Sequence, residues 1–234
     1  MNELNNILLI AHRGANKLAP ENTIKSFQKA IQLKADYIEF DTHLSKDGEI
    51  VIMHDDDTSR TTGYKGKISE MTLEELKQLD CGEGERIPTL NELIDLAKGK
   101  IGLQLEIKAK GQANKIVSLL KENNLTDTTI ISSFDHDELL EVQKLDPKLK
   151  LAPLVIGVKK NTTIQEAIDN NFYAIHPLYR FVTQKFLQKA HENNIKVNVW
   201  TVDSKSKIKK LVYLGVDGII TNDLETANKV LKRS

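Results

Sequence analysis

The sequence predicts an α/β fold, a closed (β/α)8 TIM barrel with a small insertion after the second strand, and three observations carry this prediction. Short β-branched apolar runs alternate with helical patterns, which is typical of a parallel sheet. The 234 residues approach the ~250 of an α/β barrel that forms a single domain. One hairpin turn, at Asp47-Gly48, accounts for the one strand that a simple barrel does not need. We expect one domain over residues 1–234 with an insertion at about residues 45–88, and a doubly wound open sheet is the alternative.

The apolar runs give nine expected strands. In chain order they are Ile7–Ala11, Tyr37–Asp41, Ile50–His54, Ile101–Ile107, Thr129–Ser133, Leu151–Val155, Tyr173–His176, Lys196–Thr201 and Gly218–Thr221. Helical segments lie between most of them, and several begin with a capping-box pattern, in which a capping residue is followed three positions later by Glu. These pairs are Thr72 with Glu75, Thr89 with Glu92, Asp135 with Glu138, and Thr163 with Glu166.

The third run is the surplus strand. Residues 42–49 are too few for a crossover helix, and they contain the Asp47-Gly48 turn signal. We therefore expect Ile50–His54 to run antiparallel to Tyr37–Asp41, outside the barrel. Folding this hairpin about the turn brings His54 opposite Asp41, at the same end of the barrel.

The segment from Asp55 to about Arg86 is rich in Asp, Thr, Gly and Lys, and one short helix is expected near Thr72–Leu79. We interpret it as the insertion, which can cover the mouth of the barrel. It shows no sign of a hydrophobic core of its own.

Charge and cysteine content exclude several classes of protein. The 33 basic residues balance the 33 acidic ones, which argues against a general role in binding nucleic acid or membrane surfaces. Cys81 is the single cysteine, so no intrachain disulfide forms, as in a reducing compartment. The first residues lack the basic region of a signal peptide, and no run approaches the ~20 apolar residues of a membrane span. We expect a soluble cytoplasmic protein without stable membrane insertion.

Carboxylates follow a spacing of two at the ends of two expected strands. Glu39 and Asp41 share one face, and Glu106 shares a face with Lys108. At the carboxyl ends of barrel strands these faces look into the mouth, where enzymes of this fold place their sites. Three converging carboxylates repel one another, and a divalent cation resolves that conflict. Oxygen ligands suit Mg²⁺ or Ca²⁺ better than zinc, and pairing with lysines or arginines of the barrel is the alternative.

Two histidines lie beside this acidic group. His12 ends the first strand and His54 ends the hairpin. Two imidazoles share acid and base work in phosphodiester cleavage, one activating the nucleophile and one protonating the leaving alcohol. Arg13 and Lys108 are candidates for holding phosphate oxygens. A hydrogen-bonded or exposed histidine without a catalytic role is the alternative for each.

The other histidines and the single tryptophan have weaker patterns. We expect His136 and His191 to lie on helix surfaces, His43 to approach the site, and His176 to line the mouth without a paired role. For Trp200 we weigh core packing against a wall that faces the substrate.

These motifs resemble those of the glycerophosphodiester phosphodiesterases, over nearly the whole chain and in family order. The first motifs are His12-Arg13-Gly14, Pro20-Glu21-Asn22-Thr23, Glu39-Phe40-Asp41, Lys46-Asp47-Gly48, His54-Asp55 and Arg60-Thr61-Thr62. The later ones are Leu105-Glu106-Ile107-Lys108, Ser133-Phe134, Val199-Trp200-Thr201-Val202 and Asp217-Gly218-Ile219-Ile220-Thr221. So many motifs in order are highly specific.

The resemblance implies a TIM barrel that hydrolyses glycerophosphodiesters, which are small molecules, to sn-glycerol 3-phosphate and an alcohol. The roles it implies are a divalent cation at Glu39, Asp41 and Glu106, general base and acid at His12 and His54, phosphate binding at Arg13 and Lys108, and the glycerol side at Trp200. Two positions depart from the family pattern. Asn222 follows Thr221 where many members carry Asp, and Asp203 stands where many carry Asn. We expect neither to touch the chemistry.

Two other functions are compatible with these residues. A lysophospholipase D-type lipid phosphodiesterase resembles the phospholipase-D-like toxins of the same superfamily, but the single cysteine and the lack of a signal sequence disfavour it. A catalytically silent barrel that binds phosphate ligands is disfavoured because both His12 and His54 are present. In the favoured function, water or the neighbouring glycerol hydroxyl serves as nucleophile, and the second route passes through a cyclic phosphate.

Overall fold

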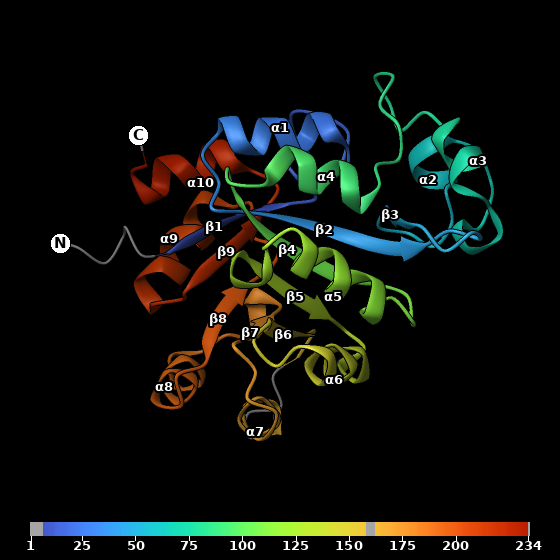
Figure 1. The fold of residues 1–234 in the computed structure, drawn as a ribbon. Coiled ribbons are helices and arrows are strands. Elements are labelled where there is room, and N and C mark those ends of the chain that lie inside the picture. Colours follow the sequence, from blue (N-terminus) through green and yellow to red (C-terminus); the bar gives the residue numbers. More distant parts are fainter. Residues whose placement is uncertain (1–6, 158–161, 234) are drawn as a thin grey trace.

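The computed structural model describes residues 7–157 and 162–233, and in them eight parallel strands close into a barrel (Figure 1). The barrel strands are β1 (Leu8–His12), β2 (Tyr37–Leu44), β4 (Gly102–Ile107), β5 (Thr129–Ser133), β6 (Lys150–Val155), β7 (Ala174–Pro177), β8 (Lys196–Val199) and β9 (Gly218–Thr221). The hydrogen-bonded order runs from β1 through β9, β8, β7, β6, β5 and β4 to β2, and β1 also pairs with β2. That pairing closes the ring, so the predicted TIM barrel is confirmed and the open sheet is excluded.

Helices follow the barrel strands and form the outer layer (Figure 1). They are α1 (Ile24–Gln32), α4 (Leu90–Ala97), α5 (Ala113–Glu122), α6 (His136–Leu145), α7 (Thr162–Asp169), α8 (Gln184–Glu192), α9 (Lys205–Leu214) and α10 (Leu224–Leu231), with short 3₁₀ turns η3 (Thr126–Thr128) and η4 (Tyr179–Phe181). None of the helices in the described residues is long and apolar enough to cross a membrane.

Side chains of β2 point alternately to the helix layer, where the hydrophobic core lies, and to the barrel interior, where the candidate site lies. Ile38 and Phe40 of β2 are fully buried and point outward into the layer between strands and helices. There the ring of Phe40 packs edge to face on Phe27 of α1, with centroids 6.3 Å apart. Because side chains of a strand alternate between its two faces, Glu39 and Asp41 point into the barrel.

The predicted hairpin is confirmed, but Met53 and not His54 lies beside Asp41, because the Met53 amide donates to the Asp41 carbonyl at 3.0 Å. Strand β3 (Ile50–Ile52) pairs antiparallel with the end of β2, with Ile52 opposite Thr42. The turn is longer than a two-residue Asp-Gly loop, because the Ser45 amide donates to the Glu49 carbonyl at 2.9 Å. Gly48 occupies the left-handed position of this loop with φ of +78°. Strand β2 therefore extends three residues beyond its predicted end, and β3 ends two residues early.

The insertion contains a small core, and our expectation of none is wrong. It comprises α2 (Ser59–Thr62), the 3₁₀ turn η2 (Ile68–Glu70) and α3 (Leu73–Lys77), beside the far ends of β2 and β3 (Figure 1). Its buried side chains are Val51, Met53, Ile68, Leu76, Cys81 and Ile87. The apolar residues are spread over 37 positions of a polar segment (51–87), so the sequence has no periodic apolar pattern there that predicts a core.

Two of the four predicted capping boxes are confirmed. The hydroxyls of Thr72 and Thr89 accept from the amides of Glu75 and Glu92, whose carboxylates accept from the cap amides in return. This reciprocal pairing satisfies amides that have no partner within the helix.

The other two capping predictions are wrong in detail. Asp135 caps α6, but its carboxylate accepts from the amide of Asp137. Thr163 lies inside α7, which begins at Thr162, and the residue before that helix lies outside the described residues. A box that we did not predict, Thr23 with Ser26, begins α1.

The turn after β1 depends on a glycine. Gly14 has φ of +76°, and a Cβ there would lie 2.3 Å from Ser26 Oγ and 2.8 Å from the Ser26 carbonyl carbon. Because the main-chain carbonyl is not free to move aside, a side chain at position 14 displaces the start of α1. That start holds Arg13, whose carbonyl accepts from Ser26 Oγ at 3.2 Å.

We predict that Gly14→Ala destabilises the protein well beyond Gly99→Ala. Gly99 has a similar φ of +73° but nothing within 4 Å of its Cβ position, so that control variant carries only the left-handed penalty of about 1 kcal/mol. Gly14→Ala adds the clash, for a total of about 3 kcal/mol. Urea unfolding of both variants measures this difference, and equal losses would contradict the packing described.

Candidate active site

A cavity of about 110 Å³ opens at the carboxyl ends of the barrel strands. Seven of the eight residues predicted for the site line it, and the eighth, Asp41, lies buried beside them. The lining residues are His12, Arg13, Glu39, His54, Gln104, Glu106, Lys108, Phe134, Leu154, Trp200, Thr201 and Ile220. The structure thus brings every predicted site residue to one place.

Three carboxylates converge in this cavity. Glu39, Asp41 and Glu106 each place one oxygen within 4.8 Å of the others, and all three are buried. The barrel register produces this arrangement, because Asp41 of β2 lies directly opposite Glu106 of β4. Among the described residues this is the one group of side chains arranged to hold a metal ion.

Two cations and an amide contact the carboxylates. Lys108 Nζ lies 2.9 Å from Glu106 Oε1 and 3.5 Å from Asp41 Oδ1. Arg13 Nε lies 3.5 Å from Asp41 Oδ2. Asn22 Nδ2 donates to that same oxygen at 2.9 Å. The alternative of pairing with barrel cations therefore holds for Asp41, which has both as partners, and for Glu106, which pairs with Lys108.

The main chain of the first turn also enters the cluster. Arg13 has φ of +55°, and its amide donates to Glu39 Oε2 at 2.8 Å. The amide of Asn22, itself with φ of +56°, donates to the Arg13 carbonyl at 3.0 Å. Left-handed main chain in residues other than glycine is held in place by such contacts.

The pKa values show that the negative charge is not fully compensated. Burial, together with Asp41 and Glu106, raises the pKa of Glu39 well above its ordinary value. Burial and the Asp41 charge raise the pKa of Glu106 to about 7, against the opposing charge of Lys108. For Asp41, burial acts upward, but Lys108 and Arg13 outweigh it and lower the pKa.

This donor set fits a divalent cation. Three buried carboxylates face two fixed cations, which leaves one negative charge in a desolvated site. Such a charge is costly unless a proton or a metal ion takes it up. All the ligand atoms are oxygens, which suits hard cations such as Mg²⁺ and Ca²⁺.

His12 contacts a residue that we expected to play no part. Its Nδ1 lies 2.7 Å from Asn222 Oδ1, and Asn222 in turn bonds Asp203. Asn222 therefore contacts a predicted catalytic residue directly, which we did not expect. Burial, followed by the charge of Arg13, lowers the pKa of His12 below 6.5, so the ring is neutral near pH 7.

His54 is held by charged partners instead. Its Nδ1 donates to Asp55 Oδ1 at 2.6 Å, and Arg60 of the insertion pairs with the other oxygen of Asp55. Arg60 also bonds Glu21 at 2.6 Å. Glu21 then reaches Arg13 at 3.1 Å, so the insertion is tied to the mouth by a continuous network of ion pairs.

One wall of the cavity is apolar. Trp200 follows β8, and its indole nitrogen donates to the His176 carbonyl at 2.7 Å, which fixes the ring. Phe134, which follows β5, meets it edge to face with centroids 5.6 Å apart. Trp200 lines the cavity, which is the second of the two expectations stated for it.

The remaining histidines have structural contacts. His43 Nε2 donates to the carbonyl of His54 at 3.2 Å, so it helps to fix the main chain of His54. His176 does not line the mouth as expected. It is fully buried inside the barrel, accepts from Asn198, and burial lowers its pKa to about 3. His191 is on the surface as expected, whereas His136 is half-buried.

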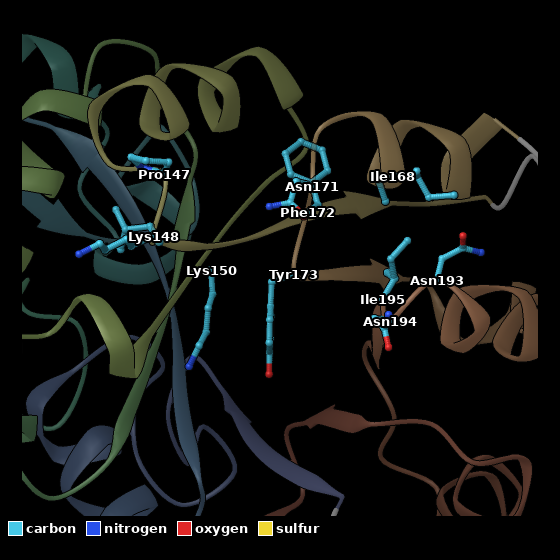
Figure 2. Close-up of a pocket in the computed structure, with 12 residues that line it drawn as sticks. Pro147, Lys148, Lys150, Ile168, Asn171, Phe172, Tyr173, Asn193, Asn194 and Ile195 are labelled. Carbon is cyan, nitrogen blue, oxygen red and sulfur yellow. The ribbon is translucent and has the colours of Figure 1, made fainter.

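A larger cavity of about 460 Å³ lies at the opposite end of the barrel, where β6, β7 and β8 begin (Figure 2). Of the described residues that line it, none carries a carboxylate or an imidazole. Of its two lysines, Lys148 and Lys150, the second already donates to the Asp127 carbonyl and lies over the ring of Tyr173. Enzymes of this fold react at the other end, so this cavity is not the candidate site.

The fold and the site together define a (β/α)8-barrel hydrolase with two imidazoles beside an acidic site for a cation. A sequence profile described as the glycerophosphoryl diester phosphodiesterase family matches residues 12–226. The chain belongs to that family, as its motifs indicated, and it is an enzyme.

Relatives extend over the full length of the chain. A glycerophosphodiester phosphodiesterase of Caldanaerobacter subterraneus is 39% identical, with 97% of this chain and 98% of that protein covered. A phosphodiesterase of Oleispira antarctica, solved in complex with the product sn-glycerol-3-phosphate, is 30% identical with a TM-score of 0.90 and 96% of each chain covered. A protein of Silicibacter pomeroyi shares the fold with a TM-score of 0.91 at 23% identity, over 98% of this chain and 97% of that one.

The raised pKa of Glu106 predicts how stability depends on pH without metal. The folded protein holds a proton on Glu106 up to about pH 7, whereas the unfolded chain releases it near 4.5. The stability from this proton is therefore lost as pH rises through the folded pKa, by about 1 kcal/mol between pH 6.5 and 8. His12, His43 and His176 oppose this loss, because burial lowers their pKa values in the folded protein while the unfolded chain still binds protons on them near 6.5. The contribution of Glu106 is therefore read from the difference between the wild type and Glu106→Gln, in which the histidine contributions cancel.

Thermal unfolding of chelated protein over this pH range measures the slope. Over this range Glu106→Gln should become more stable relative to the wild type by about 1 kcal/mol, and added Mg²⁺ or Ca²⁺ should stabilise the wild type more at the upper pH than at the lower. A difference in stability between chelated wild type and Glu106→Gln that does not change over this range would contradict the charge balance described.

Proposed function

We propose that this protein hydrolyses glycerophosphodiesters to sn-glycerol 3-phosphate and an alcohol, with one divalent cation at Glu39, Asp41 and Glu106. The observation that carries the proposal is that two histidines with opposite kinds of partner line one small cavity over three carboxylates. The names of the Caldanaerobacter relative and of the Oleispira product complex agree with this substrate class.

Charge balance supports a phosphodiester as the ligand. The acidic cluster with Arg13 and Lys108 carries one net negative charge, so a bound divalent cation changes it to one positive charge. A phosphodiester has a single negative charge and neutralises the site. Arg13 and Lys108 are placed to contact its unesterified oxygens, the first as a fork and the second as a point charge.

The hydrogen-bond partners divide the acid and base roles. His12 bonds a neutral amide and has a lowered pKa, so it is the unprotonated imidazole and the general base. His54 bonds the carboxylate of Asp55, a partner that stabilises positive charge on the ring, so it is the general acid. Opposite partners for two like groups are the usual means of assigning them opposite roles.

The reaction then needs one proton on each side of the phosphorus atom. When bound, the divalent cation polarises a phosphate oxygen and offsets developing charge. His12 accepts the proton of the nucleophile as the nucleophile's oxygen forms a bond to phosphorus. His54 donates a proton to the oxygen of the leaving alcohol as the bond between that oxygen and phosphorus breaks. With water as nucleophile the products form directly. With the neighbouring glycerol hydroxyl, a cyclic phosphate forms and water opens it.

The first prediction of this proposal concerns the cation. Glycerol 3-phosphate release from glycerophosphocholine and glycerophosphoethanolamine should disappear on chelation and return with Mg²⁺ or Ca²⁺. Glu39→Ala and Asp41→Ala should abolish metal-dependent activity and keep the fold. Asp95→Ala, which removes an exposed carboxylate on α4, is the matched control and should retain activity. Full activity in excess EDTA would sink the metal requirement.

The second prediction separates the two histidines by leaving group. Each single substitution, His12→Ala or His54→Ala, should lower the rate by about 10²- to 10⁴-fold with choline as the leaving alcohol. With nitrophenol, which departs without a proton, the loss in His54→Ala should shrink and that in His12→Ala should not. Equal losses for both variants with both leaving groups would refute this division of roles.

A further inference from the structure

Two polar residues, Asn222 and Asp203, are linked to His12 by hydrogen bonds and have no role assigned so far. Asn222 follows β9, and its Oδ1 lies 2.7 Å from His12 Nδ1 and 2.6 Å from Asn16 Nδ2. Its Nδ2 lies 2.8 Å from Asp203 Oδ2, on the loop after β8. A connected series of hydrogen bonds thus runs from Asp203 through the Asn222 amide to the ring of His12.

Asp203 fixes which way the Asn222 amide points. Its Oδ1 accepts from the Asn222 main-chain amide at 2.8 Å and from the Thr221 hydroxyl at 3.0 Å. Its Oδ2 therefore faces the Asn222 side chain. A carboxylate only accepts, so the NH₂ group of Asn222 must face Asp203 and its oxygen must face His12.

The amide oxygen in turn fixes the proton on the imidazole. An amide oxygen accepts and does not donate, so His12 Nδ1 must carry the hydrogen of the neutral ring. The other ring nitrogen, Nε2, is then left with a free lone pair. The opposite tautomer would place two lone pairs against each other at 2.7 Å.

We propose that Asp203 and Asn222 are positioning residues that hold His12 in the Nδ1-protonated tautomer, so that Nε2 faces the substrate as a proton acceptor. This inference rests on the proposed role of His12 as general base. It gives the two positions that depart from the family pattern one shared task, because they bond each other and act on the ring together.

Replacing the Asp203 carboxylate by an amide should switch His12 to the other tautomer. In Asp203→Asn the new amide keeps its oxygen on the Asn222 main-chain amide and turns its NH₂ toward the Asn222 side chain. The Asn222 amide then rotates to present its oxygen to position 203 and its NH₂ to His12. Nδ1 becomes an acceptor, the ring proton moves to Nε2, and the base is lost.

A second variant restores the arrangement with the partners exchanged. In the double variant Asp203→Asn/Asn222→Asp, the carboxylate at position 222 accepts both from the amide at 203 and from His12 Nδ1. The Nδ1 proton should return, and with it the activity. A merely structural role for the pair gives no reason for a tautomer to switch and switch back.

The control is Asp217→Asn at the opposite end of the barrel. Asp217 also accepts a main-chain amide, that of Val197 at 2.8 Å, and it pairs with Lys196 at 3.0 Å. This variant loses comparable structural bonds far from His12. It should lower the unfolding temperature while leaving kcat and the His12 tautomer unchanged.

Two measurements on the full chain test the proposal. Nitrogen-15 NMR of labelled histidine, with the His12 signals assigned from a His12→Gln sample, reports which ring nitrogen carries the proton, both with Mg²⁺ and after chelation. Wild type and the double variant should show protonated Nδ1, and Asp203→Asn should show protonated Nε2. Asp203→Asn should also lose about 10²- to 10⁴-fold in kcat with little change in KM.

A wild-type His12 with its proton on Nε2, or an Asp203→Asn variant that keeps the wild-type tautomer, would overturn the proposal. So would a double variant that regains the tautomer but no activity. Failure of the proposed function has a different signature. In that case the purified wild type releases no glycerol 3-phosphate from any substrate, while the NMR result stands or falls by itself.

Discussion

Convergence of three buried carboxylates is the constraint on which the rest of this structure depends. Glu39, Asp41 and Glu106 are forced together by the alternation of β2 and its register with β4. The apolar layer around Phe40 holds β2 so that these groups cannot turn outward. Lys108 and Arg13 offset part of the repulsion. The remaining repulsion raises the pKa values of Glu39 and Glu106, as expected for a group of carboxylates that suits a cation.

The two histidines of the site have different hydrogen-bond partners, and these partners come from different parts of the chain. His12 is hydrogen-bonded to the neutral amide of Asn222 in the loop between β9 and α10, and His54 is hydrogen-bonded to the carboxylate of Asp55 in the insertion. Arg60 connects that insertion back to Glu21 and hence to the first turn. The insertion is thus joined to the candidate site through Arg60.

Local pattern predicted the barrel and seven of the eight candidate site residues, because strand alternation and strand ends are local properties. For Trp200 the pattern left two positions open, and only the family resemblance indicated the substrate side. The hairpin at Asp47-Gly48 explained the ninth strand on the same basis. Contacts between residues far apart in the sequence could not be predicted. Asn222 lies 210 positions from His12, and Arg60 lies 39 from Glu21. Neither pair has a spacing that indicates contact. His176 was misplaced because a strand end alone does not tell a residue at the mouth from one buried in the barrel.

The most direct test of the central claim is calorimetric titration of chelated protein with Mg²⁺ and Ca²⁺ in buffers of different ionisation enthalpy. The account predicts one ion bound per chain near pH 7 and net release of protons, because Glu106 and Glu39 must lose theirs to become ligands. Glu106→Gln should bind more weakly and release fewer protons. Absence of binding, or binding without proton release in the wild type, would contradict the view that these carboxylates form a cation site.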